Sequence, residues 1–122
     1  MYVKDRLRRS MMFVPGNNPG MIRDAHIYGA DSIMFDLEDS VAYTEKDTAR
    51  FLVYNLVKYQ RPKNKYVVVR VNGLYSEYLD EDLEAIVRAQ PDAIRLPKVE
   101  YAKEVERIDQ RVTQIEQAAG LP

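Results

Sequence analysis

The chain has 122 residues, of which 46% are hydrophobic and 30% charged, and its formal net charge is -1. These proportions are ordinary for one soluble globular domain, and the near-zero charge gives no sign of a nucleic-acid partner. The absence of cysteine excludes disulfides and thiolate metal sites, and the single His26 excludes a zinc centre of several histidines. No secretory signal or membrane-length apolar stretch is present, so we expect a cytoplasmic protein with no membrane partner.

Residues 1–9 form a locally basic N-terminal arm that contains Lys4, Arg6, Arg8 and Arg9. Basic residues at a chain end are more often solvated than bound to phosphate. We therefore expect a solvated arm, with a phosphate contact as the alternative.

The first strand and helix are predicted on either side of a strong turn. An apolar strand over Met11–Val14 is broken by Pro15–Gly20, which has the strongest turn chemistry in the sequence. Asn18 is a good N-cap for the following helix, because Pro19 then occupies the first helical position. Gly29 suits a left-handed residue at the end of that helix.

Two further strands flank a second helix. The apolar run Ile33–Asp36 predicts a buried strand. Thr44 and Asp47 resemble a capping box for a helix that ends before Pro62. Three consecutive valines then predict a strand over Val67–Val71.

The last third of the chain repeats the pattern. A helical stripe that begins at Leu79 ends before Pro91, and a short strand is predicted over Ile94–Leu96. Apolar residues at helical spacing over Val105–Ala119, followed by Gly120, predict a final helix. Strands and helices therefore alternate, which is typical of an α/β protein with a parallel sheet and right-handed crossovers.

Polar segments follow every predicted strand: Pro15–Asn18, Asp36–Asp39, Arg70–Gly73 and Pro97–Lys98. In a parallel sheet these strand ends point the same way, so an acidic pair, an arginine and a lysine converge on one rim. A TIM-type barrel takes about 250 residues, and four strands cannot close one. The chain is therefore either a small open sheet or the first half of a larger structure.

Three carboxylates, Asp36, Glu38 and Asp39, end the second strand. Asp36 and Glu38 share a face if the strand extends that far, because side chains alternate along a strand. Two aligned acids suggest a cation, a base or an arginine partner, and the alternative is that they cap a helix. Arg70 ends its own strand with the same inward parity as Asn72.

Five segments, in this order and spacing, resemble a known family: Arg9–Asn17, Gly29–Val41, Lys46–Arg50, Val69–Gly73 and Arg95–Lys98. Together they are similar to the citrate lyase β family, within the magnesium-dependent lyases that include citramalyl-CoA and malyl-CoA lyases. The resemblance runs from about Arg8 to the end of the chain and covers only the N-terminal part of that family.

The resemblance implies a fold and an activity. Residues 1–122 would form a single partial domain, the first four βα units of a TIM-type (β/α)8 barrel, with helices on one outer side of sequential strands. The activity would be that of a carbon-carbon lyase, which cleaves a citryl thioester into oxaloacetate and an acetyl thioester in citrate breakdown. The implied cofactor is Mg2+, and the implied partners are the citrate lyase α subunit and the acyl-carrier γ subunit. Because the family's metal ligands come on later strands, we expect no metal ligand here and no activity of the chain alone.

The resemblance also implies residue roles. Arg70 matches the substrate arginine and would act in catalysis with Asp36 and Glu38. Glu38 and Asp39 would bind the water ligands of the metal. The implied substrate-binding residues are Arg70, Asn72, Lys98, Pro15 and Gly16. The backbone N–H groups after Pro15 could take a carboxylate or a phosphate, and a plain turn is the alternative. Since Arg70 would face a solvated site, we expect Arg70→Lys to leave folding nearly unaffected.

Other functions stay open. The chain is alternatively a related CoA-thioester lyase of the citramalyl-CoA or malyl-CoA type, or a non-catalytic module that binds a partner through unpaired strand edges. The sequence leaves open whether an acyl-carrier protein or free CoA carries the thioester. Uncovered strand edges and an apolar inner face predict that the chain forms oligomers.

Overall fold

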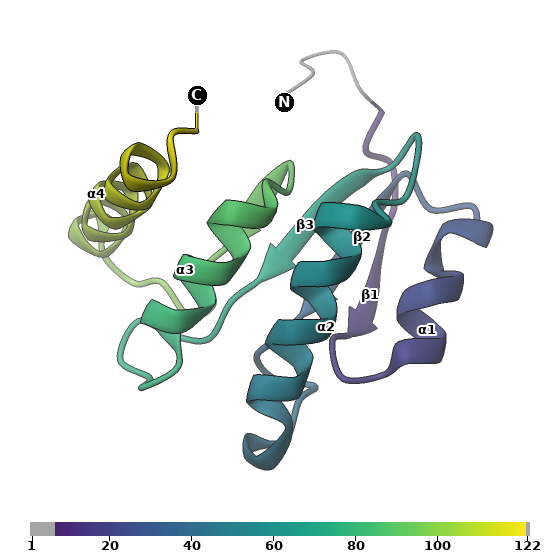
Figure 1. Ribbon diagram of the computed structural model, residues 1–122, viewed down its shortest axis with the longest axis horizontal. Coiled ribbons are helices and arrows are strands. Elements are labelled where there is room, and N and C mark those ends of the chain that lie inside the picture. Colours follow the sequence, from purple (N-terminus) through teal and green to yellow (C-terminus); the bar gives the residue numbers. More distant parts are fainter. Residues whose placement is uncertain (1–6, 122) are drawn as a thin grey trace.

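The computed structural model describes residues 7–121, in which strands alternate with α-helices (Figure 1). The strands are β1 (Met11–Pro15), β2 (Ser32–Asp36), β3 (Tyr66–Arg70) and β4 (Ala93–Arg95). The α-helices are α1 (Pro19–Asp24), α2 (Lys46–Tyr59), α3 (Leu79–Ala89) and α4 (Ala102–Ala119). Short 3-10 helices follow α1 and precede α2, at η1 (Ala25–Ile27) and η2 (Tyr43–Glu45).

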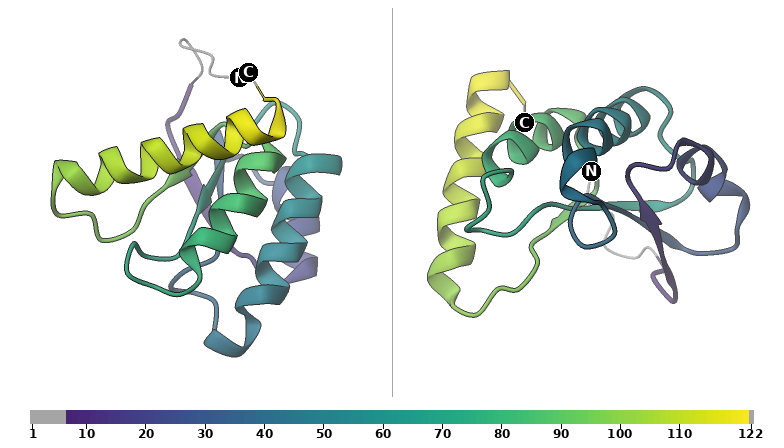
Figure 2. Two further views of the ribbon diagram at one scale, coloured as in Figure 1. Left: turned by 60° about the vertical axis from the view of Figure 1, so that its left-hand side comes forward. Right: turned by 90° about the horizontal axis from the view of Figure 1, so that it is seen from below.

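All neighbouring strands are parallel, and they follow one another in the order β1-β2-β3-β4. The helices arc around one side of this sheet (Figure 2). The predicted α/β fold, with sequential parallel strands and helices on one side, is therefore confirmed, and a doubly wound order is excluded. The same arrangement characterises consecutive units of a TIM-type barrel.

Alternation along the strands divides the sheet into two faces. On the face toward the helices, Ile33, Phe35, Val67 and Val69 are fully buried and pack against α1 and α2. Burying each such side chain stabilises the fold by roughly 1.5–3 kcal/mol. A second cluster, which includes Val71, joins the end of β3 to α3 and α4. The helix-facing side of the sheet is thus the main core.

Several predicted element ends differ from the observed ones. Gly29 has no left-handed backbone, because α1 continues into the 3-10 turn η1 and the chain then becomes extended at Tyr28. Thr44 lies inside η2, and α2 is capped at Glu45 without a side-chain hydrogen bond, so the predicted capping box is wrong. By contrast, Asn18 accepts from the backbone N–H of Met21 and caps α1 as predicted.

The last two strands end one residue earlier than the sequence indicates. β3 ends at Arg70 and β4 at Arg95. Val71 and Leu96 instead pack in the cluster formed with α3 and α4. Their apolar side chains made the strands look longer, because burial beside a helix and burial in a strand leave the same sequence pattern.

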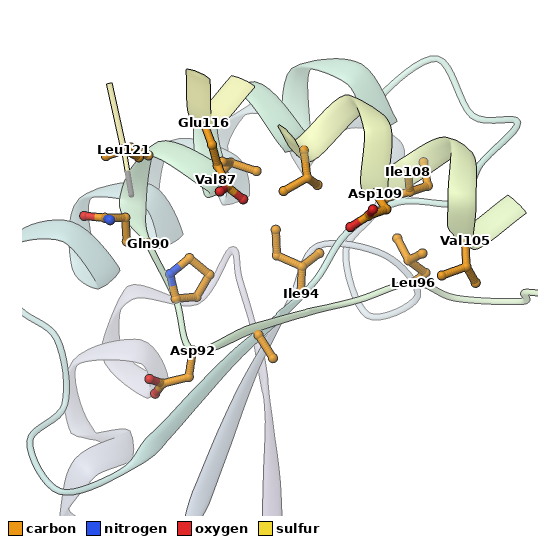
Figure 3. Close-up of a pocket in the computed structure, with 13 residues that line it drawn as sticks. Val87, Gln90, Asp92, Ile94, Leu96, Val105, Ile108, Asp109, Glu116 and Leu121 are labelled. Atoms are coloured by element: carbon orange, nitrogen blue, oxygen red, sulfur yellow. The ribbon is translucent and has the colours of Figure 1, made fainter. Parts of the chain in front are cut away.

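The opposite face of the sheet is only partly covered. Met34 is buried there, but Phe13 and Met11 of β1 are 51% and 41% exposed. At the other edge, a groove of about 460 Å³ separates β4 from α4, where Ile94 and Leu96 lie beneath the helix (Figure 3). The inner face and the groove therefore leave apolar surface unpartnered in the described chain.

The described end of the predicted basic arm lies against the sheet, and residues 1–6 are outside the described residues. Arg9 donates to Asp31 through Nε at 2.9 Å and through Nη2 at 3.0 Å, although 72% of its side chain is exposed. The guanidinium of Arg8 lies 4.8 Å from the ring centre of Tyr66. None of the helices in residues 7–121 is long and apolar enough to cross a membrane.

A close backbone approach ties the end of β1 to the end of β2. The N–H of Gly16 donates to the carbonyl oxygen of Asp36 at 2.8 Å. A Cβ atom at residue 16 would lie 2.7 Å from that same oxygen and 3.0 Å from side-chain carbons of Leu37 and Val53. Residue 16 must therefore be glycine for the two strand ends to keep this spacing.

We predict that Gly16→Ala destabilises the protein by about 2 kcal/mol, because its Cβ would collide with backbone that cannot rotate away. Chemical unfolding of the variant and the parent would measure the change. Gly29→Ala is the matched control, since Gly29 has ordinary backbone and no atom lies within 4 Å of the position that its Cβ would take. Equal stability of the two variants would contradict the close approach.

Candidate functional site

The polar strand ends meet at one rim of the sheet, as the sequence predicts. A cavity of about 570 Å³ lies there, between the segments that follow β2, β3 and β4. Four of the predicted site residues line it: Glu38, Asp39, Asn72 and Lys98. Asp36 and Arg70 are the last residues of β2 and β3, next to the segments that line the cavity, but they do not line it themselves.

The centre of this rim is a bidentate ion pair between Asp36 and Arg70. The two residues are register partners on adjacent strands, so their side chains share a face. Nε and Nη2 of Arg70 donate to the two carboxylate oxygens of Asp36 at 2.8 and 2.7 Å. Asp36 is 1% exposed and Arg70 19%, so the pair is largely removed from water. Of the roles considered for Asp36, the structure shows an arginine partner.

Asp36 also organises the loop that follows its own strand. Its carboxylate accepts from the N–H of Glu38 at 2.9 Å, and from the N–H and hydroxyl of Ser40 at 3.0 and 2.7 Å. Burial raises the pKa of Asp36, but the hydrogen bonds from Arg70, Ser40 and Glu38 outweigh burial and hold that pKa well below its ordinary value. Asp36 is therefore a fixed anion rather than a proton carrier.

Arg70 keeps donors for a ligand after it has bound Asp36. A guanidinium has five N–H groups, and the pair uses Nε and one N–H of Nη2. The remaining donors lie on the edge formed by Nη1 and Nη2, and Nη1 is 3.9 Å from Glu38. The guanidinium carbon also lies 5.5 Å from the ring centre of Phe13. One edge of Arg70 is thus anchored and the other is free to take a second carboxylate.

The ion pair between Asp36 and Arg70 changes the expected effect of Arg70→Lys on stability. The sequence predicts that Arg70→Lys leaves folding nearly unaffected, on the premise that the guanidinium faces a solvated site. The hydrogen bonds that Arg70 donates to Asp36 raise the pKa of Arg70, and most of its side chain is covered. A lysine cannot make both bonds to the buried carboxylate, so Arg70→Lys is expected to cost stability as well as function.

Glu38 lies between two positive charges at the rim. Its carboxylate oxygens are 3.9 Å from Nη1 of Arg70 and 3.8 Å from Nζ of Lys98. Lys98 is 82% exposed and has a left-handed backbone, with φ of 56°. Such a long, exposed ion pair contributes little stability, so Lys98 is placed near the cavity without being fixed in it. Asp39 is exposed at the same cavity.

Pro15 and Gly16 form a turn whose polar groups are largely used within the protein. The N–H of Gly16 is bonded to the carbonyl of Asp36, and the carbonyl of Pro15 accepts from the N–H of Asn18. The structure therefore gives this segment the role of joining β1 to β2. A ligand-binding role for Pro15 and Gly16 stays a prediction.

Sequence reasoning missed Lys46, the first residue of α2. It is only 5% exposed, and its Nζ donates to the carbonyl oxygens of Leu37 and Glu38. Burial lowers the pKa of Lys46, and the nearby acids oppose this effect. A lysine at the start of a helix is normally solvated, so the helical pattern gives no sign that Lys46 is buried. The only signal in the sequence is that Lys46 belongs to the segment Lys46–Arg50, which resembles the family.

A second missed group connects Asn72 to the helices. Asp82, in the first turn of α3, accepts from the backbone N–H and side-chain amide of Asn72 at 3.0 and 2.6 Å. Arg50 of α2 donates to the other oxygen of Asp82 at 2.8 Å. Acids in the first turn of a helix are ordinary, so no local pattern distinguishes Asp82 from its neighbours.

The described carboxylates do not make a metal centre by themselves. Residues 7–121 contain no cluster of three or more acidic or histidine side chains placed to hold a metal ion. Asp36 is already occupied by Arg70, Ser40 and the N–H of Glu38. Glu38 and Asp39 line the cavity, and they fit a role in binding metal-bound water rather than in a complete ligand set.

We predict that the Asp36→Asn variant is about 2 to 3 kcal/mol less stable than the parent at pH 7, because Arg70 loses its charged partner. The pKa of Asp36 is lowered in the folded state, so its contribution is complete above its ordinary pKa of about 3.9 and declines as the pH falls toward the folded pKa. At pH 3 the stability difference should be smaller by about 1 kcal/mol. Chemical unfolding at both pH values checks this.

Asp24→Asn is the control for that experiment. Asp24 pairs with its neighbour Arg23 at the surface, and 42% of its side chain is exposed. This substitution should change stability little at either pH. A difference between parent and Asp36→Asn that stays constant from pH 7 to pH 3 would contradict the lowered pKa of Asp36.

Comparison with known sequences identifies relatives. The pattern of the HpcH/HpaI aldolase/citrate lyase family matches residues 9–121. The chain is 51% identical to the citrate lyase subunit beta of Leuconostoc mesenteroides subsp. cremoris, over 97% of this chain and 39% of that protein. It is 39% identical to a (3S)-malyl-CoA thioesterase of Cereibacter sphaeroides, over 82% of this chain and 35% of that protein. The chain thus spans about two-fifths of the length of the relatives it matches.

Comparison of folds also identifies a citrate lyase beta subunit. A citrate lyase beta subunit from Mycobacterium tuberculosis, complexed with oxaloacetate and magnesium, aligns with a TM-score of 0.64 and 28% identity, over 80% of this chain and 42% of that one. RipC from Yersinia pestis aligns with a TM-score of 0.67 and 28% identity, over 91% of this chain and 44% of that one. Together with the sequence match over nearly its whole length, these similarities show that the chain belongs to the HpcH/HpaI aldolase/citrate lyase family.

Proposed function

We propose that this chain forms the N-terminal part of a carbon-carbon lyase that cleaves a citryl thioester into oxaloacetate and an acetyl thioester. The observation that carries the proposal is the half-anchored Arg70, whose free edge lies beside Glu38, a residue that lines the cavity. Identity of 51% to a citrate lyase subunit beta supports the choice of substrate. The step belongs to citrate breakdown.

Arg70 would hold a carboxylate of the substrate in this reaction. Retro-aldol cleavage converts a hydroxyl-bearing carbon into a keto group, and a carboxylate on that carbon must stay fixed while the bond breaks. The pair with Asp36 prevents the guanidinium from turning, so its Nη1 and Nη2 donors are preorganised. Glu38 would complete the catalytic group as proposed from the sequence, close to both Arg70 and Lys98.

The proposed enzyme also includes a magnesium cofactor and further subunits. A bound Mg2+ would polarise the carbonyl oxygen, and its ligands would come from residues that this chain does not include. Relatives with magnesium bound, and the description of relatives as beta subunits, support a metal cofactor and an assembly with α and acyl-carrier γ subunits. The apolar inner face and the β4 groove support an oligomer within that assembly. The cytoplasmic location stays a prediction.

A related CoA-thioester activity is the second candidate. The (3S)-malyl-CoA thioesterase of Cereibacter sphaeroides shares 39% identity with this chain, which supports a CoA thioester other than citryl-CoA as the alternative substrate. Cleavage of citramalyl-CoA or malyl-CoA by a lyase would use the same arginine for the same carboxylate. A non-catalytic module that binds through the strand edges is the remaining alternative.

The direct test is a chimaera in which residues 9–121 replace the matching segment of the Leuconostoc mesenteroides citrate lyase subunit beta. We expect the chimaera to release oxaloacetate from citryl-CoA when magnesium is present, and the 122-residue chain alone to release none. Parallel assays with malyl-CoA and citramalyl-CoA separate the candidate substrates. A folded chimaera without activity on any of the three thioesters would favour the non-catalytic module.

In this chimaera, we predict that Arg70→Lys lowers turnover by about a hundredfold, because the variant loses a preorganised planar donor. The assay should run at a temperature where circular dichroism shows the variant to be folded, since the substitution also weakens the pair with Asp36. Arg88→Lys is the control, because Arg88 forms an exposed pair with Glu84 away from the cavity. Full activity of Arg70→Lys would exclude Arg70 as the substrate arginine.

A further inference from the structure

The buried carboxylate of Asp82 is hydrogen-bonded to Asn72, a residue that lines the cavity. Asp82 is 0% exposed, and its Oδ2 accepts both the backbone N–H of Asn72, at 3.0 Å, and the side-chain amide, at 2.6 Å. Asn72 itself is 3% exposed and lines the cavity. A charged group on a helix outside the cavity therefore contacts the wall of the cavity from behind.

Arg50 stabilises this arrangement from α2. Its Nε donates to Oδ1 of Asp82 at 2.8 Å, and its Nη1 donates to Asp47 and Glu81. Burial lowers the pKa of Arg50, but the hydrogen bond to Asp82 and the surrounding acids outweigh burial and raise that pKa. Asp82 is thus charge-balanced, which a carboxylate with no solvent contact requires.

The chemistry of Asp82 fixes the orientation of the Asn72 amide. An ionised carboxylate only accepts hydrogen bonds, so the NH2 group of Asn72 must face Asp82. The amide oxygen then points to the other side. Within residues 7–121 no group donates a hydrogen bond to that oxygen. The oxygen is nevertheless not fully buried. It therefore keeps solvent contact on a residue that lines the cavity.

We propose that Asp82, held by Arg50, is a positioning residue that presents the amide oxygen of Asn72 to the cavity as a hydrogen-bond acceptor. Its partner is a donor on the ligand, and, resting on the proposed function, this donor is the hydroxyl group of a hydroxy-acid thioester. The acceptor orients that hydroxyl while Arg70 holds the neighbouring carboxylate. Asn72 contacts the substrate, and Asp82 acts only through Asn72.

A double-mutant cycle in the chimaera tests this dependence. Asn72→Ala removes the acceptor and should lower kcat/KM for citryl-CoA about tenfold. Asp82→Asn lets the amide of Asn72 rotate and should lower kcat/KM by a similar factor in the parent. In the Asn72→Ala background the same Asp82→Asn change should lower it by less than about twofold, because no oriented amide remains. Equal effects in both backgrounds would overturn the positioning role.

Asp80→Asn is the matched control for the cycle. Asp80 lies two residues before Asp82 in the first turn of α3 and carries the same charge, and its exposed side chain pairs with Arg111. In the described part of the chain its carboxylate bonds Arg111 and has no hydrogen bond with Asn72. Its substitution should leave kcat/KM unchanged, whereas a decrease like that of Asp82→Asn would assign the effect to the charge at the start of α3.

Nuclear magnetic resonance of the 122-residue chain tests the orientation of the Asn72 amide without an activity assay. It also avoids the Asp82→Asn variant, in which the buried Arg50 would lose its charged partner. With asparagine labelled by ¹⁵N, the side-chain amide of Asn72 should exchange with solvent at least about tenfold more slowly than that of exposed Asn64. Asn72→Ala identifies the signal. Equally fast exchange would overturn the hydrogen bond to Asp82. Slow exchange in a chimaera that lacks activity would retain the Asn72 orientation and reject the proposed function alone.

Discussion

The rim of this protein depends on the ion pair between Asp36 and Arg70. The pair is buried enough that neither side chain can exchange its partner for water without a large cost, and it joins two adjacent strands at their polar ends. Asp36 then uses its remaining lone pairs to fix the N–H groups of Glu38 and Ser40. The loop, the second acid and the free edge of Arg70 are all placed by this one carboxylate.

Hydrogen bonds from two other elements fix the backbone of residues 36–38. Gly16 bonds the carbonyl of Asp36, and Lys46 binds the carbonyls of Leu37 and Glu38. A segment of irregular backbone with charged side chains is thereby tied by hydrogen bonds to the end of β1 and the start of α2. Preorganisation of this kind suits a site that must bind a carboxylate without rearranging, because the cost of orienting the donors is met during folding. Single substitutions at Asp36 or Arg70 are therefore expected to change stability and binding together.

The sequence predicts the fold well because its signals are local. Apolar runs mark the strands, and turn residues and prolines mark the breaks, so the sequential parallel sheet follows from alternation and from the family resemblance. The ends of elements are less predictable: Val71 and Leu96 are buried beside helices rather than in strands, and Gly29 is not a left-handed cap. In each case tertiary packing decides between conformations that the local sequence allows equally.

The site is predictable only in part, for a related reason. Asp36 and Arg70 could be proposed because they end apolar strands at a polar rim and because Arg70 matches the substrate arginine of the family that the sequence resembles. Lys46, Arg50 and Asp82 could not, because each is a charged residue near the start of a helix, where exposure is the usual outcome. Their burial follows from contacts between residues far apart in the sequence, such as Arg50 with Asp82, which no periodic pattern indicates.

The central claim is that Arg70 is anchored through one edge and offers the other to a substrate carboxylate. A crystal structure of the chimaera with oxaloacetate tests it most directly. We expect a carboxylate of oxaloacetate on Nη1 and Nη2 of Arg70, while Nε keeps its hydrogen bond to Asp36. Oxaloacetate bound away from Arg70, or bound only after Asp36 has been displaced, would contradict this claim.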